Sequence, residues 1–360
     1  MKIMILANDS VGLYKFRSEL IKELIKDNEI VILSPTGMFI DELKDIGCKC
    51  IDIPIDRRGI NPLKDIKLLN SYKKLLKKEM PNLVITYTIK PNVYGGLVCR
   101  VLKIPYAINI TGLGTAFEND GIIKQIVILM YKISCKNAKI VFFENEANRQ
   151  LFIKERIVKP TQTYRLNGAG VNLDYYKKID YPKGEKIKFL FMGRVMAEKG
   201  VNELFNAMER LISDGYNCEL NVLGGYEEDY ENIIINFEKA GWLHYYGFQQ
   251  DVRPFIGNCH CFVLPSWHEG MANTNLESAA SGRPVITSNI HGCLEAIEDN
   301  VTGYLVEKKN ANSLYTCMKK FCDMSLQERE RMGELARIRM EKKFDKRVIV
   351  QETINNLFEE

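Results

Sequence analysis

The sequence of 360 residues lacks several features that would assign its chemistry at once. It contains no Asp-x-Asp, so the two-carboxylate clamp that holds Mg²⁺ or Mn²⁺ against a diphosphate is missing. The absence of Gly-x-Ser-x-Gly disfavours a Ser-His-Asp hydrolase. We expect no bound metal, because His268 and His291 fit ordinary loop residues better than a metal pair. None of the four histidines lies in the first half of the chain: they are His244, His260, His268 and His291.

Long apolar runs are also absent. No run reaches the roughly 20 residues of a transmembrane helix, and MKIMILAND lacks the basic start and longer apolar stretch of a secretory signal. The ten cysteines show no zinc spacing, because the pairs Cys48/Cys50 and Cys259/Cys261 have no partner pair. We therefore expect reduced thiols in a cytoplasmic protein.

The composition is that of an ordinary globular protein, with 46% hydrophobic and 27% charged residues. A chain of 360 residues is longer than one hydrophobic core usually supports, which predicts two domains. The net charge of +4 is accompanied by no basic and aromatic stripe, so we expect no nucleic-acid partner.

Apolar runs typical of strands alternate with helical patterns along the chain, which predicts a parallel α/β architecture. A polar stretch rich in Gly and Lys, over 167–188, separates two groups of runs. We predict two Rossmann-like domains, 1–175 and 176–344, whose parallel sheets face each other across a cleft. A C-terminal helix near 345–360 is expected to pack back onto the first domain. The predicted strands occupy 2–7, 29–35, 48–54, 83–88, 105–110, 139–144, 161–166, 188–193, 218–224, 244–248, 261–266, 284–288 and 302–306.

Two glutamates follow a predicted strand, where ligands of open α/β sheets bind. Glu269 and Glu277 lie eight positions apart in WHEGMANTNLESAASGRPVI, across a small-residue loop and a helix start. Backbone N–H groups converge on an anion at such a place. The two carboxylates suit hydroxyl groups on either side of the anion. A solvated pair on a surface helix fits the spacing equally well.

Two cations follow another predicted strand, in GRVMAEKG. Gly193 permits a tight strand exit, and the planar fork of Arg194 with the point charge of Lys199 suits a diphosphate. Cations are unfavourable near a helix N-terminus unless an anion joins them, which favours a ligand here. The alternative is that Arg194 and Lys199 are two solvated surface cations. Gly224 and Gly225 end the next predicted strand and fit either a plain turn or close approach to a ligand.

Together with YYGFQQDV and NIHGCLEAIEDNVTGYLV, these segments resemble the nucleotide-sugar half of the retaining family 4 glycosyltransferases. The resemblance implies the GT-B fold and identifies the glutamate pair with the family's Glu-x7-Glu element. It implies that Glu269 contacts the donor sugar and Glu277 the ribose, while Arg194 and Lys199 neutralise the departing diphosphate. The implied catalytic residues are thus Glu269, Arg194 and Lys199. The implied donor-binding residues are Glu277, Gly12, Gly193, Gly224, Gly270, Met271, Asn273, Thr274, Asn275 and Leu276.

The first half is similar to a subgroup that builds bacterial capsule, O-antigen or protein-linked glycans on a lipid carrier. The segments concerned are NDSVGLYKFR, TYTIKPNVYGG and NITGLGTAFEN. Many family members carry a histidine after the fifth strand, where Thr111 stands here, so no catalytic histidine is carried over. GLGTAF is not a dinucleotide fingerprint, because Phe117 occupies the place of the third glycine. The implied acceptor-side residues are Lys15, Arg17, Lys90, Thr111, Gly112 and Gly114.

The resemblance implies a retaining, metal-independent hexosyl- or N-acetylhexosaminyltransferase without a cofactor. Such an enzyme moves a sugar from a UDP-sugar to an undecaprenyl-diphosphate type of lipid-linked saccharide, in the synthesis of bacterial surface polysaccharide. Two alternatives stay open. The first is a catalytically silent, nucleotide-binding partner subunit of another transferase, because Thr111 departs from the family pattern. The second is a GT-B sugar-nucleotide epimerase, which would need further catalytic acids and bases.

Two predicted helical segments are candidates for contact with a membrane. The segment 62–81 carries six lysines, and 122–139 is apolar over much of its circumference. Basic faces attract anionic lipid headgroups, whereas a buried helix with a solvated lysine face explains the first segment equally well. For the second segment we favour contact with lipid or a lipid-linked acceptor. We expect peripheral association with the inner face of the cell membrane.

Overall fold

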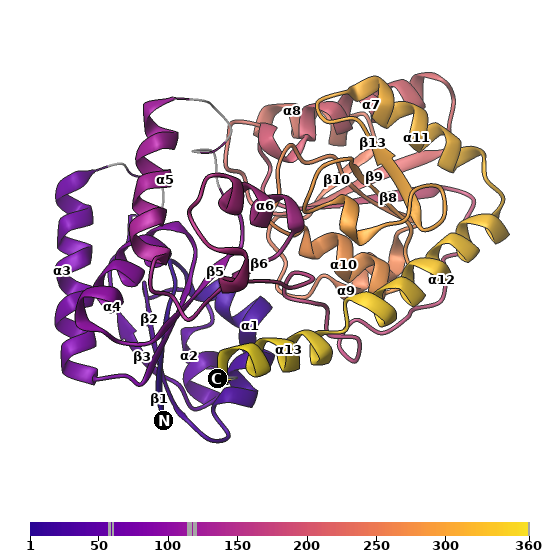
Figure 1. The fold of residues 1–360 in the computed structure, drawn as a ribbon. Helices are drawn as coiled ribbons and strands as arrows, with labels where there is room; N and C mark the ends of the chain where they lie inside the picture. Colours follow the sequence, from indigo (N-terminus) through magenta and orange to yellow (C-terminus); the bar gives the residue numbers. More distant parts are fainter. Residues whose placement is uncertain (57–58, 60, 114–116, 118–120, 359–360) are drawn as a thin grey trace. The chain divides into compact units, whose positions relative to one another are not determined.

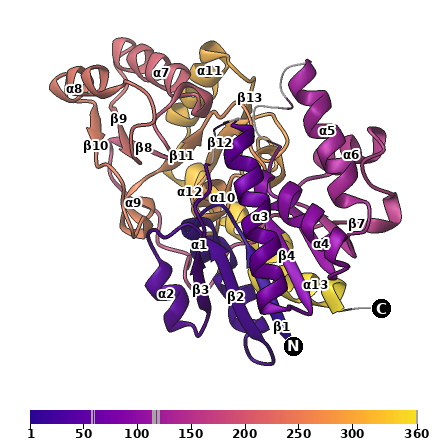
Figure 2. The same ribbon diagram turned by 90° about the vertical axis from the view of Figure 1, so that its left-hand side faces the viewer.

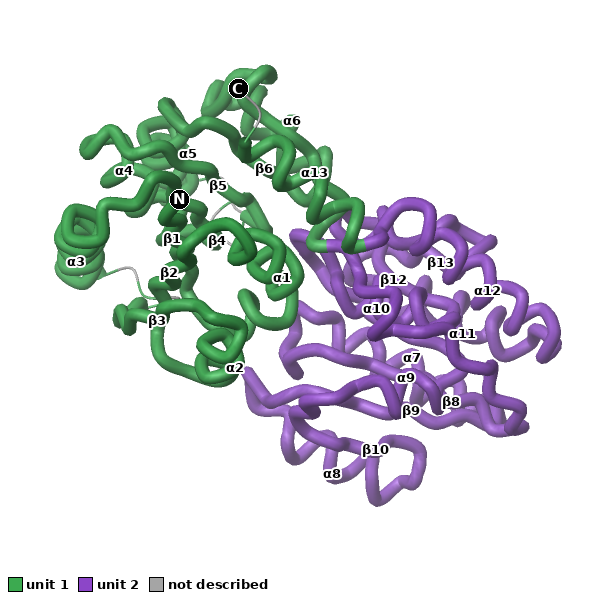
Figure 3. The backbone as a smooth tube through the Cα atoms, turned by 90° about the horizontal axis from the view of Figure 1, so that it is seen from below, with its two compact units in different colours: residues 1–169, 346–360 green, residues 170–345 purple. Residues whose placement is uncertain are grey.

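The computed structural model describes residues 1–56, 59, 61–113, 117 and 121–358. The chain divides into two compact units, Met1–Ala169 with Lys346–Glu360, and Gly170–Asp345 (Figure 3). The chain therefore leaves the first unit once and returns to it near its C-terminal end. Within the described ranges, no helix combines the length and the apolar character needed to cross a membrane.

The first unit contains a seven-stranded parallel sheet with the order β3-β2-β1-β4-β5-β6-β7 (Figures 1 and 2). The central strand β1 pairs in parallel register with both β2 and β4. The chain therefore reverses its direction of winding next to β1, which in such sheets is where ligands bind. The strands are β1 (Lys2–Leu6), β2 (Glu29–Ser34), β3 (Lys49–Asp52), β4 (Leu83–Tyr87), β5 (Tyr106–Ile110), β6 (Ile140–Phe143) and β7 (Thr163–Arg165).

Successive residues of this sheet point to opposite faces, each of which is buried by helices. Met4 and Leu6 of β1 pack with α3, α4, α5 and α6, whereas Ile3 and Ile5 pack with α1, α2 and α13. The helices are α1 (Ser10–Leu24), α2 (Ile40–Asp45), α3 (Pro62–Glu79), η1 (Pro91–Gly95), α4 (Gly96–Leu102), α5 (Ile122–Cys135), α6 (Glu146–Lys154), η3 (Pro160–Gln162) and α13 (Lys346–Phe358).

The second unit contains a six-stranded parallel sheet with the order β10-β9-β8-β11-β12-β13. Its buried side chains form one continuous core. The strands are β8 (Ile187–Met192), β9 (Cys218–Leu223), β10 (Leu243–Tyr245), β11 (Cys261–Leu264), β12 (Val285–Ser288) and β13 (Gly303–Val306). The helices are η4 (Ala197–Lys199), α7 (Val201–Ser213), α8 (Glu231–Lys239), α9 (Arg253–Asn258), α10 (Asn273–Ala280), η5 (Leu294–Ala296), α11 (Ala311–Asp323) and α12 (Leu326–Lys343).

The predicted parallel α/β architecture with two Rossmann-like sheets is confirmed. Each predicted strand range contains an observed strand or most of one. The polar stretch that separates the two groups of strands packs mainly on the second unit. There the buried guanidinium of Arg283 donates to the carbonyls of Ile179 (3.0 Å) and Asp180 (2.8 Å), and the hydroxyl of Tyr181 donates to the carbonyl of His260 (2.8 Å).

His260 is a buried histidine that stays neutral. Its Nδ1 accepts a hydrogen bond of 3.1 Å from the backbone N–H of Lys188. Burial, reinforced by the nearby positive charge of Arg329, lowers the pKa of His260 from 6.5 to about 4. The unfolded chain therefore binds a proton at this residue that the folded chain does not bind between these two pH values.

We expect the free energy of unfolding to fall by about 3 kcal/mol as the pH is lowered through this window, because protonation of His260 favours the unfolded state. Urea unfolding at a series of pH values measures the slope. His260→Asn, which retains a hydrogen-bond acceptor, should flatten it. His291→Asn, at a histidine whose side chain is 54% exposed, should not. Equal slopes in the wild type and His260→Asn would contradict this origin of the pH dependence.

Candidate functional site

In the second unit, four loops leave the C-terminal ends of the neighbouring strands β9, β8, β11 and β12. Their backbones approach so closely that certain positions must be glycine. A side chain at Gly224, whose φ is +133°, would place its Cβ 1.8 Å from the carbonyl oxygen of Gly193. The backbone N–H of Gly193 donates to Leu223 O, and that of Val195 donates to Gly225 O, both at 2.9 Å. These contacts join the loop after β8 to the loop after β9.

The loop after β8 also touches the loop after β11. A Cβ at Gly200, whose φ is +73°, would lie 2.1 Å from the carbonyl oxygen of Pro265. The backbone N–H of Trp267 donates to Glu198 O at 2.9 Å. The loop after β12 joins them in the same way, because a Cβ at Gly292 would lie 2.5 Å from the carbonyl oxygen of Glu269.

Lys199 and Glu269 form an ion pair on these joined loops. The Nζ of Lys199 donates to Oε1 of Glu269 at 2.5 Å, and their side chains are only 19% and 13% exposed. The structure therefore brings together the cation predicted for the diphosphate and the carboxylate predicted for the sugar. The sequence placed both at strand ends but did not predict this pairing.

Arg194 extends from the same loop as Lys199 but is more exposed. Its side chain is 49% exposed, and its guanidinium lies 3.6 Å from the carboxylate of Glu227 in the loop after β9. Its loop neighbour Ala197 donates its backbone N–H to the carboxylate of Glu228 at 2.8 Å. The two predicted cations thus stand in different environments, Lys199 half-buried and Arg194 near the solvent.

Glu277 lies in the second turn of α10, next to the hydroxyl of Tyr176. Burial, together with the adjacent Glu277 carboxylate, raises the pKa of Tyr176. The phenol therefore stays protonated and can orient the carboxylate as a hydrogen-bond donor. Tyr176 was not predicted from the sequence, because it lies in the polar stretch between the two groups of strands.

The other predicted donor residues of this loop and helix differ in their accessibility. The side chains of Met271, Asn275 and Leu276 are buried, and the amide of Asn275 donates to Thr287 Oγ1 at 3.1 Å. A ligand contact by these three residues would have to use their backbone. Gly270, Asn273 and Thr274 are half-buried. The N-terminus of α10 carries neither a side-chain cap nor an acidic residue in its first turn, which leaves its dipole available for an anion.

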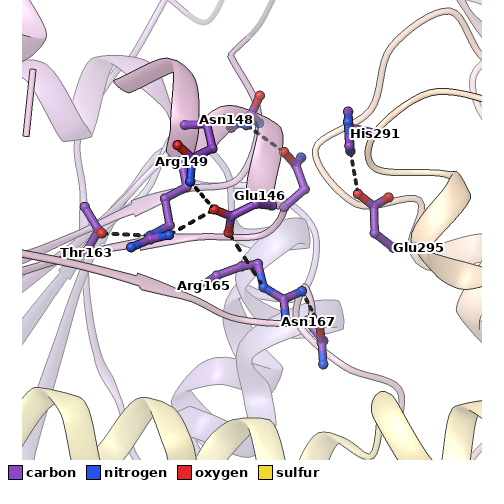
Figure 4. Close-up of polar contacts among 10 residues, drawn as sticks. Glu146, Asn148, Arg149, Thr163, Arg165, Asn167, His291 and Glu295 are labelled. Carbon is purple, nitrogen blue, oxygen red and sulfur yellow. Dashed lines mark hydrogen bonds and ion pairs between the residues drawn. The ribbon is translucent and has the colours of Figure 1, made fainter. Parts of the chain in front are cut away.

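His291 and Glu295 form a polar contact in the loop after β12 (Figure 4). The Nδ1 of His291 lies 3.0 Å from Oε1 of Glu295, and Oε2 of Glu295 accepts the backbone N–H of Gly292 at 2.7 Å. Glu295 therefore fixes the loop that contacts Glu269. His268 lies 3.7 Å from the carboxylate of Glu198. Within the part of the chain that the structure describes, no group of three or more His, Cys, Asp or Glu residues is arranged to hold a metal ion.

In the first unit, Gly12 lies in the first turn of α1. Its backbone N–H donates to the carboxylate of Asp9, the N-cap residue of this helix, at 2.6 Å. The carboxylate of Asp9 thus occupies the place at the helix N-terminus that a phosphate would take. The predicted contact of Gly12 with the donor would therefore require this cap to open. In the sequence, the signal for this helix cap was Asp9, which lies between the first strand and the first helix.

Two predicted acceptor-side cations are already paired inside the first unit. Arg17 forms an ion pair with the buried Glu144 and lies over the ring of Tyr87, 5.0 Å from its centroid. Burial raises the pKa of Glu144, against the opposing effect of Arg17. Lys90 donates to Oδ1 of Asp65 at 2.7 Å and to the carbonyl of Gly59 at 2.9 Å. Arg17 thus joins α1 to the residue after β6, and Lys90 joins the residues after β4 to α3.

The remaining acceptor-side predictions lie on α1 and directly after β5 in the first unit. Lys15 lies over the ring of Phe39, 5.8 Å from its centroid. Thr111 and Gly112 directly follow β5 and are half-buried. Gly114 lies outside the described residues.

A polar cluster at the ends of β6 and β7 was not predicted (Figure 4). The carboxylate of Glu146 accepts from Arg149 at 2.9 Å and lies 3.9 Å from the Nε of Arg165. Arg149 also donates to Thr163 Oγ1, and Arg165 donates to Asn167 Oδ1, both at 2.8 Å. Two guanidinium groups share one carboxylate, so the cluster has a net positive charge.

Comparisons with protein families agree with this architecture. Residues 176–339 match the family model described as glycosyl transferases group 1. Residues 2–145 match the model described as glycosyl transferase 4-like. The chain belongs to the glycosyltransferases that contain both of these regions. The first and second units of the glycosyltransferase thus each contain one of the two family regions.

Curated relatives of this glycosyltransferase cover most of its length. It is 29% identical to the N,N'-diacetylbacillosaminyl-diphospho-undecaprenol α-1,3-N-acetylgalactosaminyltransferase of Campylobacter jejuni, over 87% of each chain. It is 26% identical to the capsular polysaccharide biosynthesis glycosyltransferase CapM of Staphylococcus aureus, over 97% of this chain and 94% of the relative. A third relative is the UDP-Gal:α-D-GlcNAc-diphosphoundecaprenol α-1,3-galactosyltransferase of Escherichia coli, 26% identical over 81% of this chain and 79% of the relative.

Solved structures share the fold. The Anabaena protein HepE, crystallised with UDP and glucose, superposes with a TM-score of 0.81 at 15% identity, over 99% of each chain. The sucrose-phosphate synthase of Thermosynechococcus elongatus gives a TM-score of 0.79 at 16% identity, over 99% of this chain and 98% of the synthase. The glycosyltransferase has the GT-B fold with two Rossmann-like domains.

The close contact between the loops after β8 and β9 yields a test with a matched control. Gly224→Ala should lower the free energy of unfolding by about 2–4 kcal/mol, because its Cβ would overlap the Gly193 carbonyl and its φ is unfavourable for alanine. Gly225→Ala changes the adjacent glycine, whose Cβ would meet nothing within 4 Å, and should stay within about 0.5 kcal/mol of the wild type. Denaturant unfolding measures both. Equal losses would contradict the predicted steric origin.

Proposed function

We propose that the chain is a retaining, metal-independent glycosyltransferase that moves a sugar from a UDP-sugar to a saccharide on an undecaprenyl-diphosphate type of lipid. The observation that carries the proposal is the half-buried Lys199–Glu269 pair at the ligand-binding end of a Rossmann-like sheet. The names of the Campylobacter and Escherichia relatives support a lipid-diphosphate acceptor. The complex of the Anabaena protein with UDP and glucose supports a UDP-sugar donor.

Binding of the donor changes the partners of the ion pair. In the structure, Lys199 and Glu269 neutralise each other in a site that excludes most solvent. A diphosphate offers Lys199 more negative charge than one carboxylate does, so the ammonium moves to the phosphate. Glu269 is then released to accept a hydrogen bond from a hydroxyl of the donor sugar. The more exposed Arg194 adds its guanidinium to the same diphosphate.

Glu277 binds the ribose of the nucleotide. Its carboxylate is held by the Tyr176 hydroxyl, so one side of it is oriented before the donor arrives. The remaining lone pairs accept the ribose hydroxyls. The uncapped N-terminus of α10, four residues before Glu277, places the helix dipole beside the diphosphate between the two glutamates.

Transfer proceeds on one face of the donor sugar. The bond between the anomeric carbon and the diphosphate oxygen breaks, and the electron pair leaves with UDP. The acceptor hydroxyl forms the new bond from that same face, and its proton passes to the departing phosphate oxygen. Arg194, Lys199 and the α10 N-terminus stabilise the negative charge that develops on the diphosphate, so no metal is required. The configuration of the anomeric carbon is retained.

In the cell, we place this reaction in the assembly of a bacterial surface polysaccharide or glycan. The capsular glycosyltransferase of Staphylococcus aureus, 26% identical, supports this setting. A nucleotide sugar and a lipid-linked acceptor meet at the cytoplasmic side of the cell membrane, and the proposal therefore locates the protein there.

The paired residues should each be needed for transfer. Glu269→Gln and Lys199→Met should each lower kcat by about 10²–10³, because each removes a group that acts on the donor in the transition state. Lys199→Met should also weaken UDP binding, whereas Glu269→Gln should retain it. Initial rates and UDP titration calorimetry measure the two effects separately.

A matched pair supplies the control. Lys178 and Glu334 form an exposed ion pair of 3.0 Å in the same unit, and Lys178→Met should leave both measurements unchanged. Thermal unfolding of every variant verifies that it is folded. Near-normal turnover of either Glu269→Gln or Lys199→Met would overturn the assigned roles.

The reaction itself can be followed with a soluble, short-chain analogue of the lipid diphosphate acceptor. We expect transfer from a UDP-sugar with retention of the anomeric configuration, observed by NMR of the product. The rate should persist in excess EDTA, because protein cations carry the charge stabilisation.

Three outcomes would change the proposal. Inversion would reject the same-face transfer, and loss of activity with EDTA would reject metal independence. Stabilisation by GDP-sugars in a thermal-shift panel, with none by UDP-sugars, would reject the donor.

A further inference from the structure

The polar cluster of the first unit lies at the carboxyl ends of β6 and β7, and open parallel sheets bind ligands at such ends. Thr163 and Arg165 are two positions apart on β7, so their side chains extend from the same face of the sheet. Glu146 and Arg149 are three positions apart on α6 and lie on one face of this helix. The fold thus brings two arginines, one from a helix and one from a strand, to one carboxylate (Figure 4).

One carboxylate does not balance the two guanidinium groups. Arg149 donates to Glu146 at 2.9 Å, whereas the Nε of Arg165 lies 3.9 Å from the same carboxylate. Burial alone would raise the pKa of Glu146, but hydrogen bonds from Gln150 and Arg149 and the charges of both arginines lower it. Glu146 is therefore ionised at neutral pH, and the cluster keeps a surplus of positive charge.

Other acidic residues do not pair with these arginines in the part of the chain that the structure describes. The acidic residues of the segment 111–170, besides Glu146, are Glu118, Asp120, Glu144 and Glu155. Glu144 forms its ion pair with Arg17, and Glu155 is the C-cap of α6, at the opposite end of the helix from the cluster. Glu118 and Asp120 lie outside the described residues. The described ion pairs of Arg149 and Arg165 are both with Glu146.

Both guanidinium groups keep N–H donors for a ligand. A guanidinium has five N–H groups. Hydrogen bonds to Glu146 and Thr163 engage Nη1 and Nε of Arg149, and a hydrogen bond to Asn167 engages Nη1 of Arg165. Among the described residues, the Nη2 groups of both arginines have no hydrogen-bond partner. The side chain of Arg165 is 42% exposed and that of Arg149 is 24% exposed, so a ligand can reach both.

We propose that Arg149 and Arg165 bind the diphosphate of the lipid-linked acceptor. The planar forks of two guanidinium groups suit the oxygens of a diphosphate. The diphosphate carries more negative charge than Glu146 does, so it takes the place of this carboxylate at the loosely held Arg165. The attached lipid and saccharide are thereby held at the carboxyl ends of the first sheet.

The acceptor fits this cluster better than the donor does. The diphosphate of the donor is already assigned to Arg194 and Lys199 of the second unit. In the first unit, Arg17 and Lys90 are each matched by one acid, whereas the cluster has two cations for one acid. The inference rests on the proposed transfer to a lipid-diphosphate acceptor, and it specifies the residues that recognise that acceptor.

The test uses the full chain and geranyl diphosphate, a soluble prenyl diphosphate without a saccharide. Titration calorimetry is done in saturating UDP, so that the cations assigned to the donor are occupied. Geranyl diphosphate should bind, and geranyl monophosphate and inorganic phosphate should each bind about tenfold more weakly or less, because they offer fewer oxygens and less charge.

Arg165→Gln and Arg149→Gln should each weaken the binding of geranyl diphosphate about tenfold or more, because each removes a charge-assisted contact. Arg165→Lys keeps the charge without the planar fork and should lose less than Arg165→Gln. Glu146→Gln should tighten binding about twofold to fivefold, because it removes the carboxylate that competes with the ligand. Thermal unfolding verifies that each variant is folded.

Arg331→Gln is the matched control. Arg331 also pairs with a glutamate three positions away on a helix, since its Nη1 lies 3.2 Å from Glu334 on α12. The substitution removes the same charge and the same kind of ion pair. It should leave the binding of geranyl diphosphate unchanged.

Four results would overturn the proposal. The first is no binding of geranyl diphosphate to the wild type in saturating UDP, and the second is equal binding of inorganic phosphate. The third is wild-type affinity in Arg165→Gln. The fourth is a loss in Glu146→Gln as large as that in Arg149→Gln, because the cluster would then only support the fold.

Kinetics separate this proposal from the one on which it rests. Arg165→Gln should raise the KM for a short-chain lipid diphosphate acceptor about tenfold, with the KM for the UDP-sugar and kcat at saturating acceptor unchanged. If the wild type transfers sugar but Arg165→Gln keeps the wild-type KM for the acceptor, this assignment fails and the proposed function stands. If the wild type binds geranyl diphosphate through the two arginines but transfers no sugar, the proposed function fails and the binding site stands.

Discussion

Direct backbone contact between the loops after β8, β9, β11 and β12 is the constraint on which the site of the second unit depends. Gly224, Gly200 and Gly292 allow these contacts because a Cβ at each would overlap a carbonyl of the next loop. Such contact removes the freedom that loops ordinarily have. It holds Lys199 and Glu269, on different loops, at hydrogen-bond distance with most water excluded. The opposite charges offset the desolvation that either alone would suffer. The packing of the loops therefore fixes the geometry of this ion pair.

The fold was largely predictable, because strands of parallel sheets are buried on both faces and appear as continuous apolar runs. The runs 29–35 and 261–266, for example, contain β2 and β11. Strand order could not be predicted, since the pairing of β1 with both β2 and β4 depends on crossovers rather than on any one segment. The helical turn η1, Pro91–Gly95, also could not be predicted from the sequence. Its buried Asn92 has its hydrogen-bond partners on β4 and β5, which only the fold brings together.

The candidate site was predictable where a residue belongs to a local motif. Glu269 and Lys199 were found in this way, yet their ion pair joins positions 70 residues apart and depends on the loop packing. Tyr176 was also missed, because the carboxylate that it orients belongs to Glu277 on α10, far away in the sequence. Arg17 and Lys90 were assigned to the acceptor side by the resemblance of their segments to a family subgroup. In the structure, both also have acidic partners that lie far away in the sequence, Glu144 and Asp65.

The return of the chain to its first unit has a consequence for biosynthesis. One face of the first sheet is covered by α13, whose Ile349 and Leu357 pack with residues of the first strand, and Lys346 lies 3.2 Å from Glu19 of α1. The ribosome makes this helix only after the whole second unit. At about 5–20 residues per second, roughly ten seconds to half a minute pass between the two halves of this core. During that interval the nascent first unit exposes apolar surface, so a chaperone that shields it would act before the second unit is complete.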